Sequence, residues 1–95
     1  MTAAGETLTL IHTETGMVLS RRPFADWRAV QEQFPAYKTS LSPDAPGHLV
    51  DYLADEYPEM TEETGCGWAE VVAAFLATPA PDLVLCHNGT WLCPC

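Results

Sequence analysis

The alternation of apolar and polar residues predicts two β-hairpins, one near each end of the chain. In residues 7–20, Leu8 and Leu10 alternate with threonine and isoleucine residues that favour strands. The sequence TETG within this stretch is typical of a three-residue hairpin loop with Gly16 in the left-handed conformation. In residues 82–94, Asn88 and Gly89 form the strongest short signal for a type I′ turn. We therefore predict a strand on each side of both turns.

Three stretches between these hairpins repeat their apolar residues with helical spacing. They cover residues 21–35, 46–58 and 67–79, and each ends at a proline. The apolar stripes consist of Phe24, Trp27, Val30 and Phe34 in the first, of Leu49, Val50, Leu53 and Tyr57 in the second, and of Trp68, Val71, Val72, Phe75 and Leu76 in the third. The segments between the helices, 36–47 and 59–67, are rich in proline, serine or acidic residues and are predicted to be loops.

The order of these elements predicts an α+β fold. It has an N-terminal β-hairpin, three short helices and a C-terminal β-hairpin, with the hairpins joined into one small antiparallel sheet packed on the helices. The chain has 95 residues, which corresponds to one small domain covering 1–95. Hydrophobic residues make up 47% of it, enough for a folded core. A core of this size gives only marginal stability, so a partner or a metal would help the domain.

Charge is distributed unevenly along the chain, whose net charge is −9. The four lysine and arginine residues all precede Thr39; they are Arg21, Arg22, Arg28 and Lys38. From Thr39 onward the chain carries acidic residues and no lysine or arginine. Such a segment repels nucleic acid and anionic membranes and attracts basic protein surfaces. We therefore expect a protein partner, and neither direct nucleic-acid binding nor membrane binding.

The densest acidic segment also contains tyrosines, which supply contact area and a hydroxyl group at low entropic cost. The predicted partner-binding residues are Asp51, Tyr52, Asp55, Glu56, Tyr57, Glu59, Glu62 and Glu63. Because rows of carboxylates can imitate a phosphate backbone, a nucleic-acid-binding protein would accept them in its basic site. The sequence thus suggests a small inhibitor, of the kind that a virus or mobile element encodes, which covers such a site. The alternative interpretation of the same segment is an ordinary solvated surface.

The four cysteines suggest a metal site as an alternative function. If Asn88 and Gly89 form the turn, Val84, Cys86, Trp91 and Cys93 share one face of the hairpin, and Cys95 extends it. Tetrahedral zinc takes four thiolate or imidazole ligands, and Cys66 stands where a helix N-terminus lowers a thiol pKa. The predicted ligands are Cys66, Cys86, Cys93 and Cys95, with His48 as another candidate. No C-x-x-C pair supports this site, so the primary expectation is no cofactor, with zinc as the alternative.

Three other interpretations of the cysteines are open. They can be small buried residues beside Trp91, or they can form a disulfide, for which Cys66 and a tail cysteine have the freest geometry. The C-terminal tail can also be the modified part of a ribosomally made peptide precursor. The sequence shows no signal peptide and no long apolar run, which predicts a cytoplasmic protein whose cysteines are reduced.

No catalytic motif occurs in the sequence. Cys66 with His48 or His87 is the only nucleophile and base pairing we can suggest, and no spacing supports it. The chain has no phosphate-binding glycine loop, no G-x-S-x-G and no H-E-x-x-H. We therefore expect a binding protein and not an enzyme.

Overall fold

The computed structural model describes residues 7–92, in which one sheet lies between helices on both of its faces. The strands are β1 (Thr9–Thr13), β2 (Gly16–Ser20), β3 (Tyr37–Ser40), β4 (Asp82–His87) and β5 (Thr90–Trp91). The helices are α1 (Trp27–Gln33), α2 (Pro46–Glu56), α3 (Glu59–Thr64) and α4 (Trp68–Leu76). The strand order is β3-β1-β2-β4-β5, and all neighbouring strands are antiparallel. The predicted α+β fold with one antiparallel sheet is confirmed.

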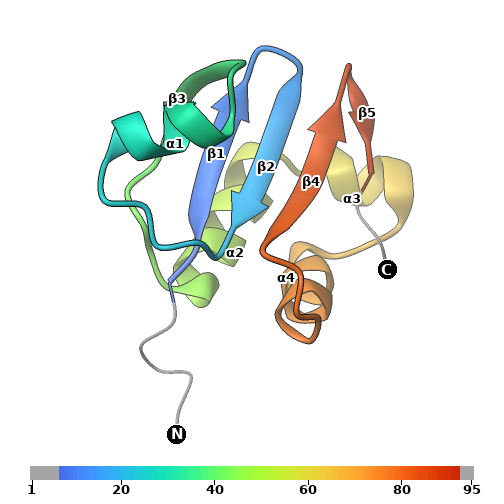
Figure 1. Cartoon of the computed structure of the whole chain (residues 1–95). Helices are drawn as coiled ribbons and strands as arrows, with labels where there is room; N and C mark the ends of the chain where they lie inside the picture. Colours follow the sequence, from blue (N-terminus) through green and yellow to red (C-terminus); the bar gives the residue numbers. More distant parts are fainter. Residues whose placement is uncertain (1–6, 93–95) are drawn as a thin grey trace, which may run out of the picture.

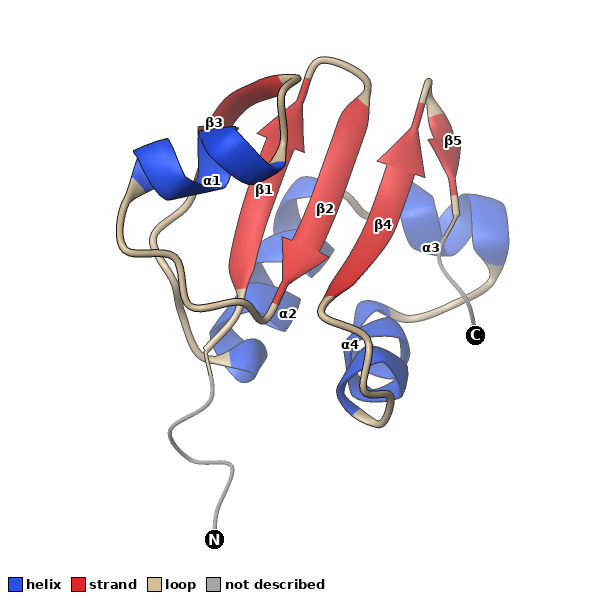
Figure 2. Ribbon diagram, viewed as in Figure 1, coloured by secondary structure: helices blue, strands red, loops and turns tan. Residues whose placement is uncertain are grey.

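The helices divide unequally between the two faces of the sheet. Figures 1 and 2 show α1 in front of the sheet and α2, α3 and α4 behind it. The larger core lies on the α2–α4 side, where Leu10, Leu19 and Leu85 from the strands pack with Leu53 and Val71 from the helices. These residues are almost fully buried, so each stabilises the fold by about 1.5–3 kcal/mol through loss of apolar surface.

A smaller core lies between α1 and the sheet. It consists of Ile11, Val18 and Val30, with Phe24 and Phe34 packed against it. The two phenylalanine rings meet edge to face with centroids 6.4 Å apart. Three residues of the predicted stripe, Phe24, Val30 and Phe34, therefore turn toward the sheet, but only Val30 of these lies within the helix, since Phe24 precedes it and Phe34 is its C-cap.

Trp27, the remaining member of that stripe, does not belong to the core. Its side chain is 52% exposed, and the Arg28 guanidinium lies over its ring at 5.1 Å from the centroid. Helix α1 also begins later than predicted. The Asp26 carboxylate accepts hydrogen bonds from the backbone N–H groups of Arg28 and Ala29, so the helix begins at Trp27 and not near Pro23.

Two segments predicted to be loops have regular structure. In 36–47, Tyr37–Ser40 forms the edge strand β3, since it pairs with β1 through Ile11↔Ser40 and His12↔Thr39. In 59–67, Glu59–Thr64 forms α3, which buries Met60 completely and ends at Gly65 with a φ of 79°. The prediction of three helices is therefore wrong by one. In both segments pairing or burial against the rest of the domain overrides the local loop signal.

The two hairpin turns had different outcomes. Asn88 and Gly89 both have positive φ, 50° and 79°, so the predicted type I′ turn is confirmed. The prediction for Gly16 is wrong, because it does not have a positive φ and lies inside β2. A Cβ atom at Gly16 would lie 1.8 Å from the Cys86 carbonyl oxygen, so close approach of β4 is what requires glycine there.

A β-bulge changes the predicted faces of the C-terminal hairpin. The pairs Cys86↔Trp91 and His87↔Thr90 are as predicted. Against β2, however, Met17 pairs with Cys86 and Val18 with Val84, which leaves one extra residue in β4. Trp91 consequently packs on the larger core while Val84, 44% exposed, lies beside Val18 on the α1 side. The predicted common face for these two residues is wrong.

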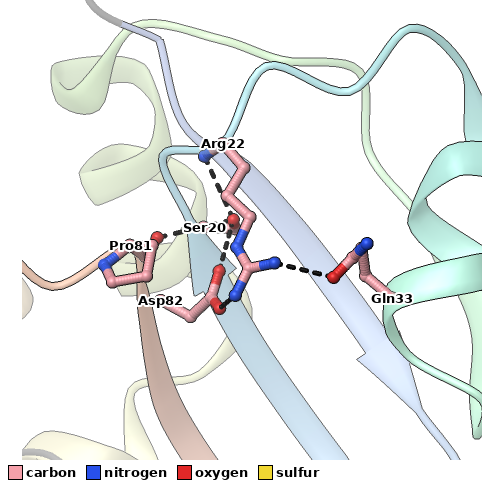
Figure 3. Close-up of polar contacts among 5 residues, drawn as sticks. All are labelled: Ser20, Arg22, Gln33, Pro81 and Asp82. Carbon is pink, nitrogen blue, oxygen red and sulfur yellow. Dashed lines mark hydrogen bonds and ion pairs between the residues drawn. The ribbon is translucent and has the colours of Figure 1, made fainter.

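A polar network connects β2, β4 and α1 at one end of the sheet (Figure 3). The Arg22 guanidinium donates to the Asp82 carboxylate at 2.6 Å and to the side-chain oxygen of Gln33 at 2.8 Å. The Ser20 hydroxyl donates to the other Asp82 oxygen at 2.6 Å and also contacts the Pro81 carbonyl at 3.5 Å. Each strand end is thereby fixed to its neighbour by charge-assisted hydrogen bonds.

Candidate functional site

The predicted acidic segment forms α2, α3 and their short connection on the back of the sheet (Figure 1). The carboxylates of this surface, which we call the acidic face, are all exposed; they belong to Asp51, Asp55, Glu56, Glu59, Glu62 and Glu63. Within residues 7–92, none of them forms an ion pair or a side-chain hydrogen bond. Their carboxylates are therefore not occupied by a direct partner in this part of the chain and are open to an external one.

The lysine and arginine residues lie elsewhere, and Arg21 and Arg22 form hydrogen bonds that connect parts of the fold. Arg22 binds Asp82 in the network described above. Arg21 donates to the carbonyl oxygens of Phe75 and Thr78 at the end of α4, and its guanidinium lies 4.6 Å from the Phe75 ring centroid. Arg28 stands on α1 and Lys38 on the edge strand β3. The acidic face is consequently not neutralised by the cations of its own chain.

The two tyrosines of the predicted site are partly buried against the larger core. The Tyr57 ring meets the Trp91 ring edge to face at 6.0 Å, and Trp91 meets Trp68 in the same way at 5.7 Å. The Trp68 indole N–H donates to the Tyr57 carbonyl at 2.9 Å. Tyr57 therefore helps to fix the end of α2 in the domain, and only part of its ring is accessible to a partner.

The same surroundings affect the Tyr57 hydroxyl. Burial raises its pKa above the usual 10.0, and the neighbouring Tyr52, Glu56 and Glu59 add to the effect. The hydroxyl therefore stays protonated at neutral pH. It can donate a hydrogen bond to an acceptor that a partner brings to the acidic face.

His48 and Asp44 form an exposed pair at the N-terminal end of α2, with 3.0 Å between Nδ1 and the carboxylate. The hydrogen bond to Asp44, together with its charge, raises the pKa of His48 above 6.5, and the bonds from His48 and the Ala45 N–H lower the pKa of Asp44. The His48 contribution to stability is thus present below pH 6.5 and is lost as pH rises through its folded pKa. Asp44 contributes stability above the pKa that it has in the unfolded chain, and this contribution is lost as pH falls through its lower pKa in the folded protein.

The structure also contains an apolar groove beside the acidic face, which sequence reasoning did not identify. It has a volume of about 540 Å³ and lies between α2, α3 and the start of α4. Val50 and Ala54 of α2 line it together with Trp68 and Ala69 of α4, and Glu62 of α3 is also among the lining residues. Only the spacing of Val50 and Ala54 by four residues hinted at this surface, and the neighbouring segment was expected to be a loop.

A second depression lies on the opposite side of the sheet. It has a volume of about 270 Å³ and is bounded by Val18, Val84 and Phe34, with Gln33 and His87 at its edge. Its surroundings lack the acidic segment, because α2 and α3 cover the other face. It provides a useful comparison for any binding experiment on the groove.

The cysteines differ from the expectation of reduced thiols. Cys66 is 2% exposed and is disulfide-bonded, whereas Cys86 is a free, half-buried thiol on β4. Cys93 and Cys95 lie outside the described residues. A sulfur in a disulfide is not a thiolate ligand, and within residues 7–92 no three histidine, cysteine or acidic side chains are grouped to hold a metal ion.

The residues considered for catalysis are not assembled into a site in the described part of the chain. His48 is bound to Asp44, and the sulfur of Cys66 is in a disulfide. His87 lies at the edge of the depression beside Val84. None of the helices in residues 7–92 is long and apolar enough to cross a membrane.

Comparison with known proteins found no relative of this chain. No protein-family model, no curated protein and no solved structure matches the chain.

Proposed function

We propose that this chain is a non-enzymatic binding protein whose acidic face docks on a basic surface of a protein partner. The observation that carries the proposal is that the carboxylates of α2 and α3 are exposed and form no ion pair within residues 7–92. Complementary charge sets partner choice and the rate of association, while neighbouring apolar surface supplies affinity. Such a partner normally binds nucleic acid in its basic site, and the domain acts as an inhibitor by covering that site.

The sequence predicts a cytoplasmic location for this binding protein, and we keep that location as part of the proposal. It requires that Cys66 be reduced in the working protein, because cytosolic thiols are kept reduced. Because Cys66 is buried, the cells are quenched in acid, the protein is alkylated under denaturing conditions without a reducing agent, and its mass is measured. An unmodified Cys66 after alkylation under denaturing conditions would instead place the protein in an oxidising compartment.

Two exposed carboxylates of the acidic face provide the test of docking. In Asp55→Lys/Glu59→Lys the face loses charge, and in the control Glu14→Lys/Glu32→Lys the same charge change occurs at exposed residues outside it. The wild type captures its partner from the source cells, and the affinity of the purified partner is then measured for each form. Loss of two close charge pairs at an interface should weaken binding by about tenfold or more in the first variant.

Binding of the control variant and competition by nucleic acid show whether the acidic face itself, net charge alone or neither is responsible for docking. We expect the control to bind within about twofold of the wild type, and DNA or RNA to compete with binding. Equal weakening of both variants would mean that only net charge matters. Unchanged binding of Asp55→Lys/Glu59→Lys, with an unchanged circular dichroism spectrum, would show that the acidic face is an ordinary solvated surface.

Two other functions suggested by the sequence remain predictions, namely a zinc-stabilised domain and a peptide precursor with a modified tail. One native mass spectrum of the protein, purified from its own host without chelator, separates them. An excess mass of one zinc ion that disappears on denaturation supports the first. A covalent mass change within the cysteine-containing tail supports the second.

A further inference from the structure

The groove between α2 and α4 adds an apolar surface to the acidic face. Val50 and Ala54 lie on one flank of α2, since they are four residues apart. Asp51 and Asp55 are the next residue in each case, and both are exposed on the same helix. Glu62 of α3, an exposed residue, is itself one of the lining residues. The groove is thus apolar along its floor and negatively charged at its edges.

This combination restricts the chemistry of an occupant. Val50, Ala54, Trp68 and Ala69 line the groove with mainly apolar surface, and the Trp68 indole N–H is already bonded to the Tyr57 carbonyl. The volume of about 540 Å³ lies within the usual range for ligand sites and can take a few apolar side chains. Carboxylates at the edge favour cations beside those side chains and disfavour an anionic ligand. The occupant is therefore apolar on one side and positively charged next to it.

The surroundings of the groove also favour a helix over an extended segment. An extended peptide binds best at a sheet edge, where unpaired backbone groups accept it. Helices α2, α3 and α4 form the groove, and their backbone groups are already hydrogen-bonded within the helices. A helix has no such requirement, because its own N–H and C=O groups are paired and it can lay an apolar stripe into a groove.

We propose that this groove receives the apolar stripe of a basic amphipathic helix from the partner protein. Large side chains of the stripe lie against Trp68, Val50 and Ala54, and lysine or arginine side chains on its flanks meet Asp51, Asp55 and Glu62. This rests on the proposed function, since it specifies which element of a basic partner is bound by the acidic face.

The experiment uses two fluorescein-labelled synthetic peptides of 18 residues with identical composition. The first has leucines at helical spacing on one face and lysines elsewhere, and the second has the same residues scrambled so that no apolar stripe exists. Anisotropy at physiological salt gives the affinity of the full chain for each. We expect the first peptide to bind at least about tenfold tighter, which corresponds to burial of about one leucine side chain.

Site-specific changes show whether the groove is responsible. Ala54→Trp fills it, whereas Ala74→Trp places the same bulk on an exposed position of α4 that does not line it. The first change should remove the preference for the amphipathic peptide and the second should keep it. In wild-type ¹⁵N spectra the peptide should shift the amide signals of Ala54 and Ala69 and leave that of Val84, beside the other depression, unchanged.

The outcomes separate this inference from the proposed function. Equal affinity for the two peptides overturns the groove as a helix site and leaves docking by charge intact. A preference that survives Ala54→Trp, or shifts at Val84 in place of Ala54, also overturns it. If neither peptide binds, the helix inference fails, and the charge-reversal pair Asp55→Lys/Glu59→Lys with the captured partner still decides the proposed function.

Discussion

Replacing Gly16 by alanine should strongly destabilise the protein, because β2 and β4 approach too closely for a side chain there. A Cβ atom at Gly16 would lie 1.8 Å from the oxygen and 2.6 Å from the carbon of the Cys86 carbonyl group. Both are backbone atoms, so no side-chain rotation relieves the overlap. The neighbouring pairs Gly16↔His87 and Met17↔Cys86 have to separate instead, in strands that lie next to each other within the sheet.

The size of the effect follows from this geometry. Overpacking costs about 1–3 kcal/mol when neighbours can shift, and backbone neighbours shift least. We expect Gly16→Ala to lower the free energy of unfolding by about 3 kcal/mol. For a domain of this length each kcal/mol corresponds to about 4–8 °C, so the melting temperature should fall by roughly 12–24 °C.

Thermal unfolding followed by circular dichroism, with four further variants, checks the reasoning. Gly47 has no atoms within 4 Å of an added Cβ and lies in α2, so Gly47→Ala should raise stability slightly. Gly65 also has open space but a φ of 79°, so Asn, which tolerates left-handed backbone, should cost less there than Ala. At Gly16, Asn should be at least as harmful as Ala. If Gly16→Asn were clearly more stable than Gly16→Ala, Gly16 would be a left-handed turn residue and the close approach of β4 would be refuted.

Three other measurements test separate parts of the structure. A double-mutant cycle of Arg22→Met and Asp82→Asn should give a coupling of about 1 kcal/mol that decreases with salt, and a value near zero would show that the partly exposed pair is not stabilising. A reducing agent should lower the stability of the wild type by about 2–4 kcal/mol and leave Cys66→Ser unchanged, whereas an equal effect on both would exclude the disulfide as the cause. In an NMR titration, His48 should have a midpoint above 6.5 because of its aspartate partner, and His12 one below 6.5 because of burial and the charge of Lys38; the opposite order would contradict the described surroundings of both residues.

Much of the fold could be predicted from local signals that the tertiary structure reinforces. Asn88 and Gly89 form the expected turn because the positive φ angles that a two-residue hairpin requires are available to them. The third predicted helix is α4, where Trp68, Val71 and Phe75 are all buried, because a helix with such a stripe has one stable orientation against the sheet. In both cases the local preference and the packing act in the same direction.

The errors occurred where the decisive contact comes from a distant part of the chain. Tyr37–Ser40 is a strand because β1 offers it an edge, and its own residues carry no strong alternation. Gly16 is constrained by Cys86, which is far away in the sequence. Because of the extra residue in β4, Trp91 and Val84 lie on opposite faces of the sheet, and no local sequence pattern reveals such a bulge. Register and close approach of this kind depend on partners that a single sequence does not identify.

The candidate site shows how an asymmetry along the sequence becomes an asymmetry between two faces. All lysine and arginine residues precede Thr39. The helix that this part of the chain forms, α1, lies on the front of the sheet. The residues that follow β3 form α2, α3 and α4 on the back before the chain returns as β4. The acidic half of the sequence therefore builds nearly all of one helical layer, and Arg21 is the residue whose guanidinium reaches the end of that layer at α4.

This arrangement explains why charge reversal on α2 and α3 should affect binding without unfolding the domain. The structural cations Arg21 and Arg22 are bound to the end of α4 and to Asp82, away from the exposed carboxylates of the acidic face. Like charges one turn apart, such as Asp51 and Asp55, disfavour the helix by a few tenths of a kcal/mol each. Lysine at one of these positions should thus stabilise α2 slightly even as it weakens docking. A variant that becomes more stable and binds less well would separate the function of these carboxylates from the fold, whereas a parallel loss of stability and binding would show that they support the structure itself.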